Sequence, residues 1–184
     1  MRLFFGLGCS PQLQLQIDHW RDSTYKVLGT GVPAENFHVT LAFLGECKEQ
    51  KLEAVLHAAS SIQESQFNLH LDQLGYWHKP GVIWLGSSAA PKNIFSLARQ
   101  CRSVAAKAKL YREKNSANRP YQPHLTLWRK QAAMPPAPIV APAFSLQCTN
   151  FSLFESVALG RNNASASVRY RELECWPLRP VFNR

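Results

Sequence analysis

The chain contains one four-residue pattern twice, and this repetition constrains the fold more than any other feature of the sequence. The pattern reads His, apolar, Thr, Leu at residues 38–41 and again at residues 124–127. Successive side chains of a β-strand point to opposite faces, so His38 shares a face with Thr40, and His124 shares one with Thr126. We therefore expect two strands that present imidazole and hydroxyl groups to a cleft, and apolar side chains that include Phe43 to a core.

The segments around the two copies repeat as well. In each half of the chain a strand ending in glycine, at Gly8 or Gly86, precedes a helix and then the strand that carries the histidine and threonine. A duplication with pseudo-twofold symmetry would bring His38 and His124 face to face across a central cleft. The alternative is that these are two buried strands whose histidines only satisfy hydrogen bonds.

Local patterns predict the remaining elements. Ser10 before Pro11 is typical of a helix start, although residues 13–17 also alternate as a strand would. Amphipathic spacing predicts two more helices, whereas alternating or compact apolar runs predict strands. Four prolines make residues 134–142 an irregular crossing. The expected helices span residues 11–24, 48–61 and 93–110, and the expected strands span residues 2–8, 38–45, 67–71, 82–86, 124–127, 144–154 and 168–176.

The positive charge of the chain is concentrated in one segment. The formal net charge is +9, which favours a polyanionic partner such as nucleic acid or an anionic membrane surface. Between Arg99 and Lys130 only Glu113 opposes the basic residues, although a solvated helix face would also explain several of them. The basic residues of this segment are Arg99, Arg102, Lys107, Lys109, Arg112, Lys114, Arg119, Arg129 and Lys130.

The cysteines indicate a reducing compartment. There are five, an odd number, and no Cys-x-x-Cys motif occurs, so we interpret them as small buried apolar residues rather than disulfide or zinc ligands. The apolar run at residues 3–7 is too short for a signal peptide or a membrane span. Together these features predict a cytoplasmic protein.

Two facing histidines and two threonines have a specific chemical capacity. Histidine acts as a general base or a general acid because its ordinary pKa is about 6.5. Threonine hydroxyls donate hydrogen bonds to the non-bridging oxygens of a phosphate. One histidine would deprotonate water while the other protonates the leaving ribose oxygen, with a bell-shaped pH dependence around neutrality. This arrangement needs no metal, and the motif pair contains no carboxylate, which argues against a phosphatase site with two metal ions.

The two motifs and their flanks resemble the 2H phosphoesterase superfamily. Residues 36–45 and 118–124, together with the opening strand at residues 2–5, are most similar to the bacterial RNA 2',3'-cyclic phosphodiesterases, also called 2'-5' RNA ligases. The resemblance covers nearly the whole chain. It implies an α+β, two-lobed, pseudo-twofold fold with antiparallel sheets around a central cleft and helices packed outside. Residues 1–184 would form one domain of two lobes, about 1–75 and 82–184, with strands exchanged between them.

The resemblance also implies an activity and residue roles. The expected reaction opens a terminal 2',3'-cyclic phosphate of RNA to a 2'-phosphomonoester, with reversible ATP-independent 2'-5' ligation. His38 would be the proton donor and His124 the proton acceptor, while Thr40 and Thr126 hold the phosphate. Arg129 matches a family arginine, but simple alternation puts it on the face opposite His124, so a phosphate role needs the strand to end or twist first. The expected partner is an RNA end, for example of a tRNA fragment, bound by a monomer without cofactor, metal or membrane.

Other residues and functions stay open at this point. His78, with Tyr76 and Trp77, could stack a nucleobase, but core packing or a plain loop explains them as well; the same holds for Trp84 and Trp128. One alternative function is a non-catalytic module that binds RNA ends. Another is a phosphodiesterase for 2'-5' oligoadenylates or nucleoside cyclic phosphates.

Overall fold

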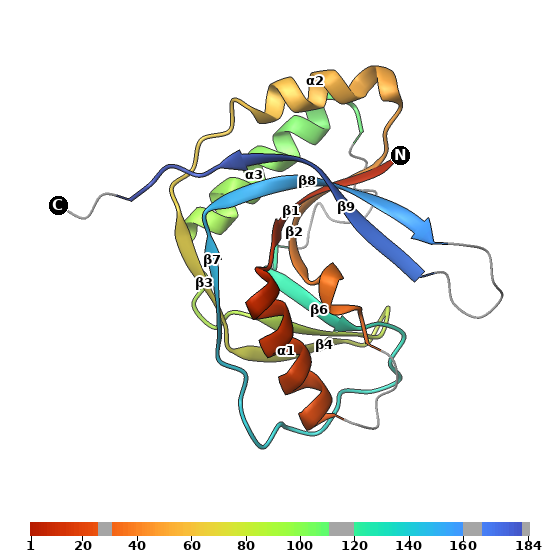
Figure 1. Cartoon of the computed structure of the whole chain (residues 1–184), viewed down its shortest axis with the longest axis vertical. Helices are drawn as coiled ribbons and strands as arrows, with labels where there is room; N and C mark the ends of the chain where they lie inside the picture. The colour runs from red at the N-terminus through yellow and green to blue at the C-terminus, as the bar shows by residue number, and fades with distance from the viewer. Residues whose placement is uncertain (26–30, 111–119, 160–166, 182–184) are drawn as a thin grey trace.

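The computed structural model describes residues 1–25, 31–110, 120–159 and 167–181. These residues form three α-helices, one short 3-10 helix and nine strands (Figure 1). The helices are α1 (Pro11–Thr24), α2 (Glu49–Ala59), α3 (Lys92–Lys107) and η1 (Ala34–Asn36). The strands are β1 (Arg2–Gly8), β2 (His38–Glu46), β3 (Phe67–Leu71), β4 (Gln73–Trp77), β5 (Val82–Gly86), β6 (His124–Trp128), β7 (Phe144–Cys148), β8 (Asn150–Leu159) and β9 (Ser167–Pro177).

Seven strands form one sheet in the order β4-β5-β6-β2-β1-β8-β9, and every neighbouring pair is antiparallel. The strands with the two motifs, β2 and β6, are neighbours near the middle, where Val39 pairs with Leu125. Strand β8 pairs with β1, and β9 forms the edge of the sheet beyond it. Strands from the end of the chain therefore lie on the same side of the sheet as the first strand. The predicted α+β class with antiparallel sheets is confirmed.

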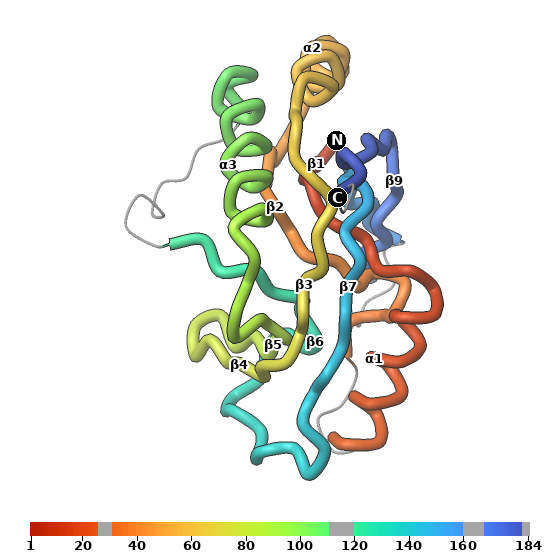
Figure 2. The backbone as a smooth tube through the Cα atoms, turned by 90° about the vertical axis from the view of Figure 1, so that its left-hand side faces the viewer, coloured from red at the N-terminus to blue at the C-terminus, as the bar shows by residue number. Residues whose placement is uncertain are grey.

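The second sheet contains only β3 and β7, which run side by side in Figure 2. Their alternate side chains Leu69, Leu71, Leu146 and Cys148 are buried. Alternation of this kind is typical of a strand with one face on a core. The pair therefore extends the hydrophobic core beyond the large sheet.

Two strand predictions differ from the structure. The single strand expected at residues 144–154 is two strands in different sheets, with Thr149 as the break between β7 and β8. The β3–β7 pairing ends at Cys148, and the Thr149 carbonyl accepts a hydrogen bond from the Leu178 N–H, next to the first β8–β9 pair. Strand β4 was not predicted, because all but its first residue are half-buried and Gly75 interrupts any alternation.

Helix α1 has the predicted start. The Ser10 hydroxyl accepts a hydrogen bond from the Leu13 N–H at 3.3 Å, and Pro11 occupies the first turn. The helix buries Leu13, Ile17 and Trp20, which removes the strand alternative for this segment. Within the described residues, no helix combines the length and apolar character that crossing a membrane requires.

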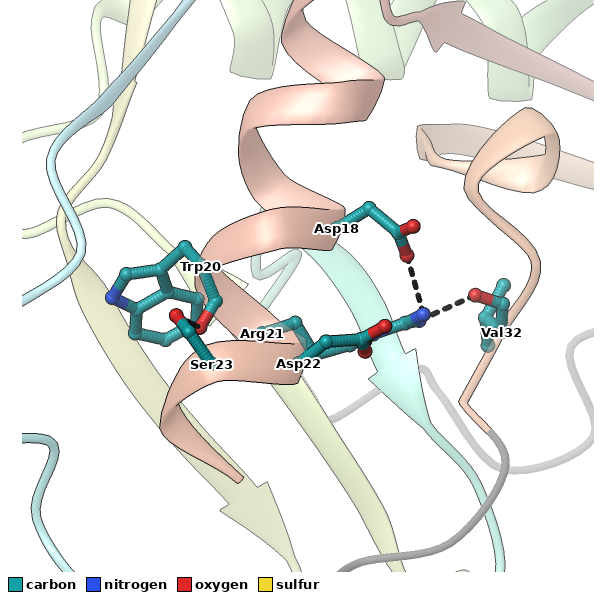
Figure 3. Close-up of polar contacts among 6 residues, drawn as sticks. All are labelled: Asp18, Trp20, Arg21, Asp22, Ser23 and Val32. Atoms are coloured by element: carbon teal, nitrogen blue, oxygen red, sulfur yellow. Dashed lines mark hydrogen bonds and ion pairs between the residues drawn. The ribbon is translucent and has the colours of Figure 1, made fainter. Parts of the chain in front are cut away.

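A buried arginine of α1 fixes the segment that leads into the first motif. Arg21 is 7% exposed, pairs with Asp18 and donates a hydrogen bond to the Val32 carbonyl (Figure 3). Its guanidinium carbon also lies 5.3 Å from the centre of the Phe37 ring, directly before the motif. A Cβ atom on Gly31 would lie 2.4 Å from the guanidinium, so a larger residue there would displace Arg21. Arg21 thus connects α1 to the start of β2.

Candidate active site

The four motif residues lie on adjacent strands around the Val39–Leu125 pair. The antiparallel register brings His38 towards Thr126 and Thr40 towards His124. Val39 and Leu125 are fully buried behind them, as the predicted alternation requires. The two imidazoles are close enough for a positive charge on His124 to affect the pKa of His38.

Both histidines are oriented by the same local hydrogen bond. The Nδ1 atom of His38 lies 2.7 Å from the Asn36 carbonyl oxygen, and that of His124 lies 2.8 Å from the Gln122 carbonyl oxygen. A carbonyl only accepts, so Nδ1 carries the proton in each neutral ring and Nε2 keeps a lone pair. The Nε2 atom of His38 lies 3.0 Å from Oγ1 of Thr40, whose hydroxyl donates to it. Each ring therefore reserves Nε2 for chemistry.

Both motif strands contain a bulge directly after the threonine. In β2, Thr40 pairs with Gly6 and Ala42 with Phe5, which leaves Leu41 as an extra residue. In β6 the corresponding extra residue is Leu127, at a register shift against β5. A bulge adds one residue to one strand and so reverses the facing of every residue after it. The duplication therefore extends to the irregularities of the strands.

The bulge in β2 corrects one prediction. Phe43 was expected in the core, but it is 63% exposed and lines a cavity beside the motif. Leu41 and Ala42 are both buried, which shows the break in alternation. The β6 bulge acts in the same way, because Leu127 and Trp128 are buried in succession. Trp128 is thus a core residue and does not stack a base.

The β6 bulge also resolves the position of Arg129. Strand β6 ends at Trp128, and the reversed facing turns Arg129 to the same side as His124 and Thr126. Arg129 is exposed. Burial of the two rings is the largest cause of the lowered pKa of His38 and of His124, and the positive charge of Arg129 lowers both pKa values further. The twist that a phosphate role requires is present in the strand.

Aromatic rings surround each histidine. The His38 ring centre is 4.8 Å from those of Phe4 and Tyr170, and the His124 ring centre is 4.4 Å from that of Trp77. Burial lowers the pKa of His38 to about 4, against the opposing effect of the Asn36 carbonyl. Burial also lowers the pKa of His124. Both rings are therefore neutral at pH 7 in the free protein.

A cavity of about 910 Å³ opens beside Thr40 and His124. The candidates Tyr76, Trp77 and His78 line it, together with Trp84. Tyr76 also packs against the core, and His78 lies in the turn after β4. The Trp84 ring lies over Gly75 and Gly86, where a Cβ atom would lie 2.1 and 2.4 Å from its ring atoms. A smaller cavity of about 200 Å³ lies on the other side, beside His38 and Tyr170.

Several residues of the site were not found by sequence reasoning. Phe4 and Tyr170 contact His38 from β1 and β9, and Tyr121 donates a hydrogen bond from its hydroxyl to the Thr40 carbonyl at 2.8 Å. Phe4 and Tyr121 lie in segments that carry the resemblance, and Tyr170 lies in the last predicted strand. Local patterns do not show that these rings contact the site, because they depend on pairing between distant segments.

The basic segment is only partly described. Arg112, Glu113, Lys114 and Arg119 lie outside the described residues. Arg102 is half-buried and lines the large cavity, whereas the other described members are exposed: Arg99, Lys107, Lys109, Arg129 and Lys130.

The five cysteines are free. Cys9, Cys47, Cys101 and Cys148 are buried, and Cys175 is half-buried. Burial raises the pKa of the thiols of Cys9 and Cys148 to about 12, so these thiols remain protonated and unreactive. Their structure fits the predicted role of small apolar residues.

Comparison with known proteins gives one consistent result. Residues 7–84 match the family described as LigT-like phosphoesterase. The chain is 36% identical to the RNA 2',3'-cyclic phosphodiesterase of Escherichia coli over 96% of both chains. The crystal structure of E. coli LigT in the apo form superposes with a TM-score of 0.81 at 35% identity, covering 97% of each chain. The same protein in complex with 3'-AMP gives a TM-score of 0.80 at 36% identity, covering 96% of this chain and 97% of that one. The chain belongs to the LigT-like phosphoesterases of the 2H phosphoesterase superfamily.

Proposed function

We propose that this protein hydrolyses the terminal 2',3'-cyclic phosphate of RNA to a 2'-phosphomonoester. Its relative from E. coli bears the name of this activity. The observation that carries the proposal is the pair of imidazoles whose Nδ1 atoms are both held by carbonyl oxygens, which leaves both Nε2 atoms for proton transfer. A module that only binds RNA ends would not need two such groups.

In the proposed mechanism His124 takes a proton from water through Nε2, and His38 gives a proton from Nε2 to the leaving 3' oxygen. His38 is neutral in the free protein, so the negative charge of the bound phosphate must raise its pKa before it can donate. Protonation of Nε2 releases the Thr40 hydroxyl, which donates to this atom in the free protein. Thr40 is then able to donate to a phosphate oxygen, as Thr126 does in this proposal, while Arg129 balances the charge.

The proposal extends to partners and setting. We infer that the substrate is an RNA end, such as that of a tRNA fragment, and that the reverse reaction forms 2'-5' linkages. The enzyme would act as a monomer in the cytoplasm, without a metal or cofactor. The free cysteines support a reducing compartment. We also propose one domain of two lobes, residues 1–75 and 82–184, with β8 and β9 exchanged to the first lobe.

Hydrolysis of a nucleoside 2',3'-cyclic phosphate in the presence of EDTA tests this function. We expect full activity with EDTA, and a loss of about 10²-fold or more in kcat for His38→Ala and for His124→Ala. An EDTA-treated protein that regains activity only with a divalent metal would refute the acid–base mechanism. Near wild-type turnover of either variant would refute the use of two histidines.

A further inference from the structure

The large cavity extends beyond the motif residues Thr40 and His124. Its volume of about 910 Å³ is near the upper end of the usual range for small-ligand sites, about 300–1,000 Å³. It extends from Thr40 and His124 to Arg102 on α3. The described residues that line it include the cations Arg102 and Lys79 and no aspartate or glutamate. The far end of this cavity is therefore suited to an anion.

Arg102 is held in place without being neutralised. Its guanidinium carbon lies 4.7 Å from the centre of the Tyr121 ring, and the Tyr121 hydroxyl is hydrogen-bonded to the Thr40 carbonyl. Arg102 is thereby connected to the motif strand through one side chain. None of the ion pairs found among the described residues involves Arg102. Within the described part of the chain, Arg102 is thus a half-buried, oriented cation without a carboxylate partner, and it lines the cavity.

Arg102 and Arg129 serve different ends of the site. Arg129 follows the second motif and acts on both histidines, and it is not among the residues that line the large cavity. Arg102 comes from another element and lies beyond Tyr121. Two separate cations match a ligand with two phosphates rather than one.

We propose that Arg102 binds the phosphodiester immediately 5' of the cyclic phosphate and so selects RNA ends over cyclic mononucleotides. This inference rests on the proposed function and adds a second phosphate subsite to it. A guanidinium forms two parallel, charge-assisted hydrogen bonds with a phosphate, and stacking on an aromatic ring leaves its N–H groups available. The ligand class is an oligonucleotide with at least one internal phosphodiester.

A charge-deletion cycle between protein and substrate tests the subsite. The measured quantity is the specificity ratio, kcat/KM for a dinucleotide with a 2',3'-cyclic end divided by kcat/KM for the cyclic mononucleotide. We expect Arg102→Gln to lower this ratio about tenfold, as for loss of a charge-assisted contact. Replacing the internal phosphodiester by a neutral methylphosphonate should lower the wild-type ratio to a similar degree. The same replacement should change the ratio of the variant less than twofold.

Arg99→Gln is the matched control, because Arg99 is an exposed arginine of the same helix that does not line the cavity. Its specificity ratio should stay within twofold of wild type. A normal ratio for Arg102→Gln, or an undiminished effect of the methylphosphonate in that variant, would overturn the subsite. If the wild-type protein hydrolyses neither substrate, the proposed function fails. The subsite is then decided by calorimetry, which should show about tenfold weaker binding of a dinucleotide 2'-phosphate to Arg102→Gln and no comparable loss for the mononucleotide.

Discussion

Phe43 in β2 and Arg129, directly after β6, occupy equivalent positions relative to the two motifs. Each follows the motif threonine by three residues, and in each strand a bulge at the leucine after the threonine turns it to the cleft face. The pseudo-twofold frame thus offers the substrate an aromatic ring from one half and a guanidinium from the other. Since the backbone arrangement is the same, this difference in side chains would, in the proposed function, fit a symmetric frame to an asymmetric ligand.

Replacing Arg129 should have two separable effects. We expect Arg129→Gln to lower kcat/KM for a cyclic nucleotide about tenfold or more, because a charge-assisted contact to the phosphate is lost. Its positive charge contributes to the low pKa of His38 and His124, so both pKa values should rise in the variant. NMR titration of the imidazole signals measures this shift. Lys130→Gln removes the same charge one residue further on and should shift the histidines less; equal shifts would show that Arg129 has no special position.

The lowered histidine pKa values predict an acidic optimum for the free enzyme. The pH dependence of kcat/KM reports groups of the free enzyme, and that of kcat reports groups of the substrate complex. Burial holds the pKa of His38 at about 4 and that of His124 below its ordinary value. The maximum of kcat/KM should therefore lie below pH 6.5, and the maximum of kcat at a higher pH, because bound phosphate raises both values. Coincident maxima near pH 7 would contradict this environment.

Anion binding should take up a proton at the same site. Sulfate is a suitable probe because its charge does not change between pH 5 and 7. If sulfate raises the pKa of His38 from about 4, its affinity should increase as the pH falls, by at most about tenfold per unit for one proton. Calorimetry in two buffers of different ionisation enthalpy counts the proton, and His38→Gln should abolish its uptake. Affinity that stays constant from pH 5 to 7 would exclude the coupling.

The same pKa shift affects stability with a defined sign. His38 has a lower pKa in the folded protein than the ordinary value of about 6.5, so below pH 6.5 the unfolded chain binds more protons than the folded one. The free energy of unfolding should therefore decrease as the pH falls from about 6.5 towards about 4. Urea unfolding at several pH values measures the slope, and His38→Gln should make it shallower over this range. An unchanged slope in that variant would show that a group other than His38 takes up the proton on unfolding.

The sequence predicted those parts of the site that depend on local signals. The Ser10-Pro11 start of α1 and the two His-x-Thr strands are encoded by neighbouring residues, and the structure shows both. The bulges were not predictable, because the extra residue in each strand is a leucine within an apolar run, and it cannot be told from an ordinary strand residue by its type. Phe43 was for that reason assigned to the wrong face, and the phosphate role of Arg129 was left to depend on a twist or an end of the strand. The surroundings of His38 depend on contacts between distant segments, since Tyr170 is delivered by a strand that pairs across the sheet.

Asn36 illustrates a contact that sequence reasoning alone could not reach. Asn36 is 5% exposed, and its main-chain carbonyl oxygen accepts a hydrogen bond from Nδ1 of His38. Its side-chain amide donates a hydrogen bond to the Val168 carbonyl and accepts one from the Tyr170 N–H, both on β9. We expect Asn36→Ala to reduce kcat about tenfold or more with less than threefold change in KM. Nitrogen NMR should show a mixture of His38 tautomers in place of the single Nδ1–H form.

A destabilised control separates this positioning effect from a general loss of structure. Val55→Ala removes buried volume on α2, away from both histidines, and should lower the melting temperature without changing the His38 tautomer. Asn36→Asp keeps an acceptor for the Tyr170 N–H and should retain more activity than Asn36→Ala. A variant Asn36→Ala with a normal tautomer and normal kcat would show that the contact only supports the fold.

The product distinguishes the roles of the two histidines. If His38 faces the 3' oxygen, the ring opens to a 2'-phosphate, and phosphorus NMR should detect this isomer alone. A substrate with sulfur in place of the bridging 3' oxygen needs no proton on its leaving group, because a thiolate is a much better leaving group than an alkoxide. His38→Ala should therefore recover at least tenfold in relative rate on the sulfur substrate, whereas His124→Ala should not, since its lost function is deprotonation of water. Recovery of His124→Ala in place of His38→Ala would exchange the two roles. A 3'-phosphate product would show that the ribose binds the other way round, even with both histidines essential.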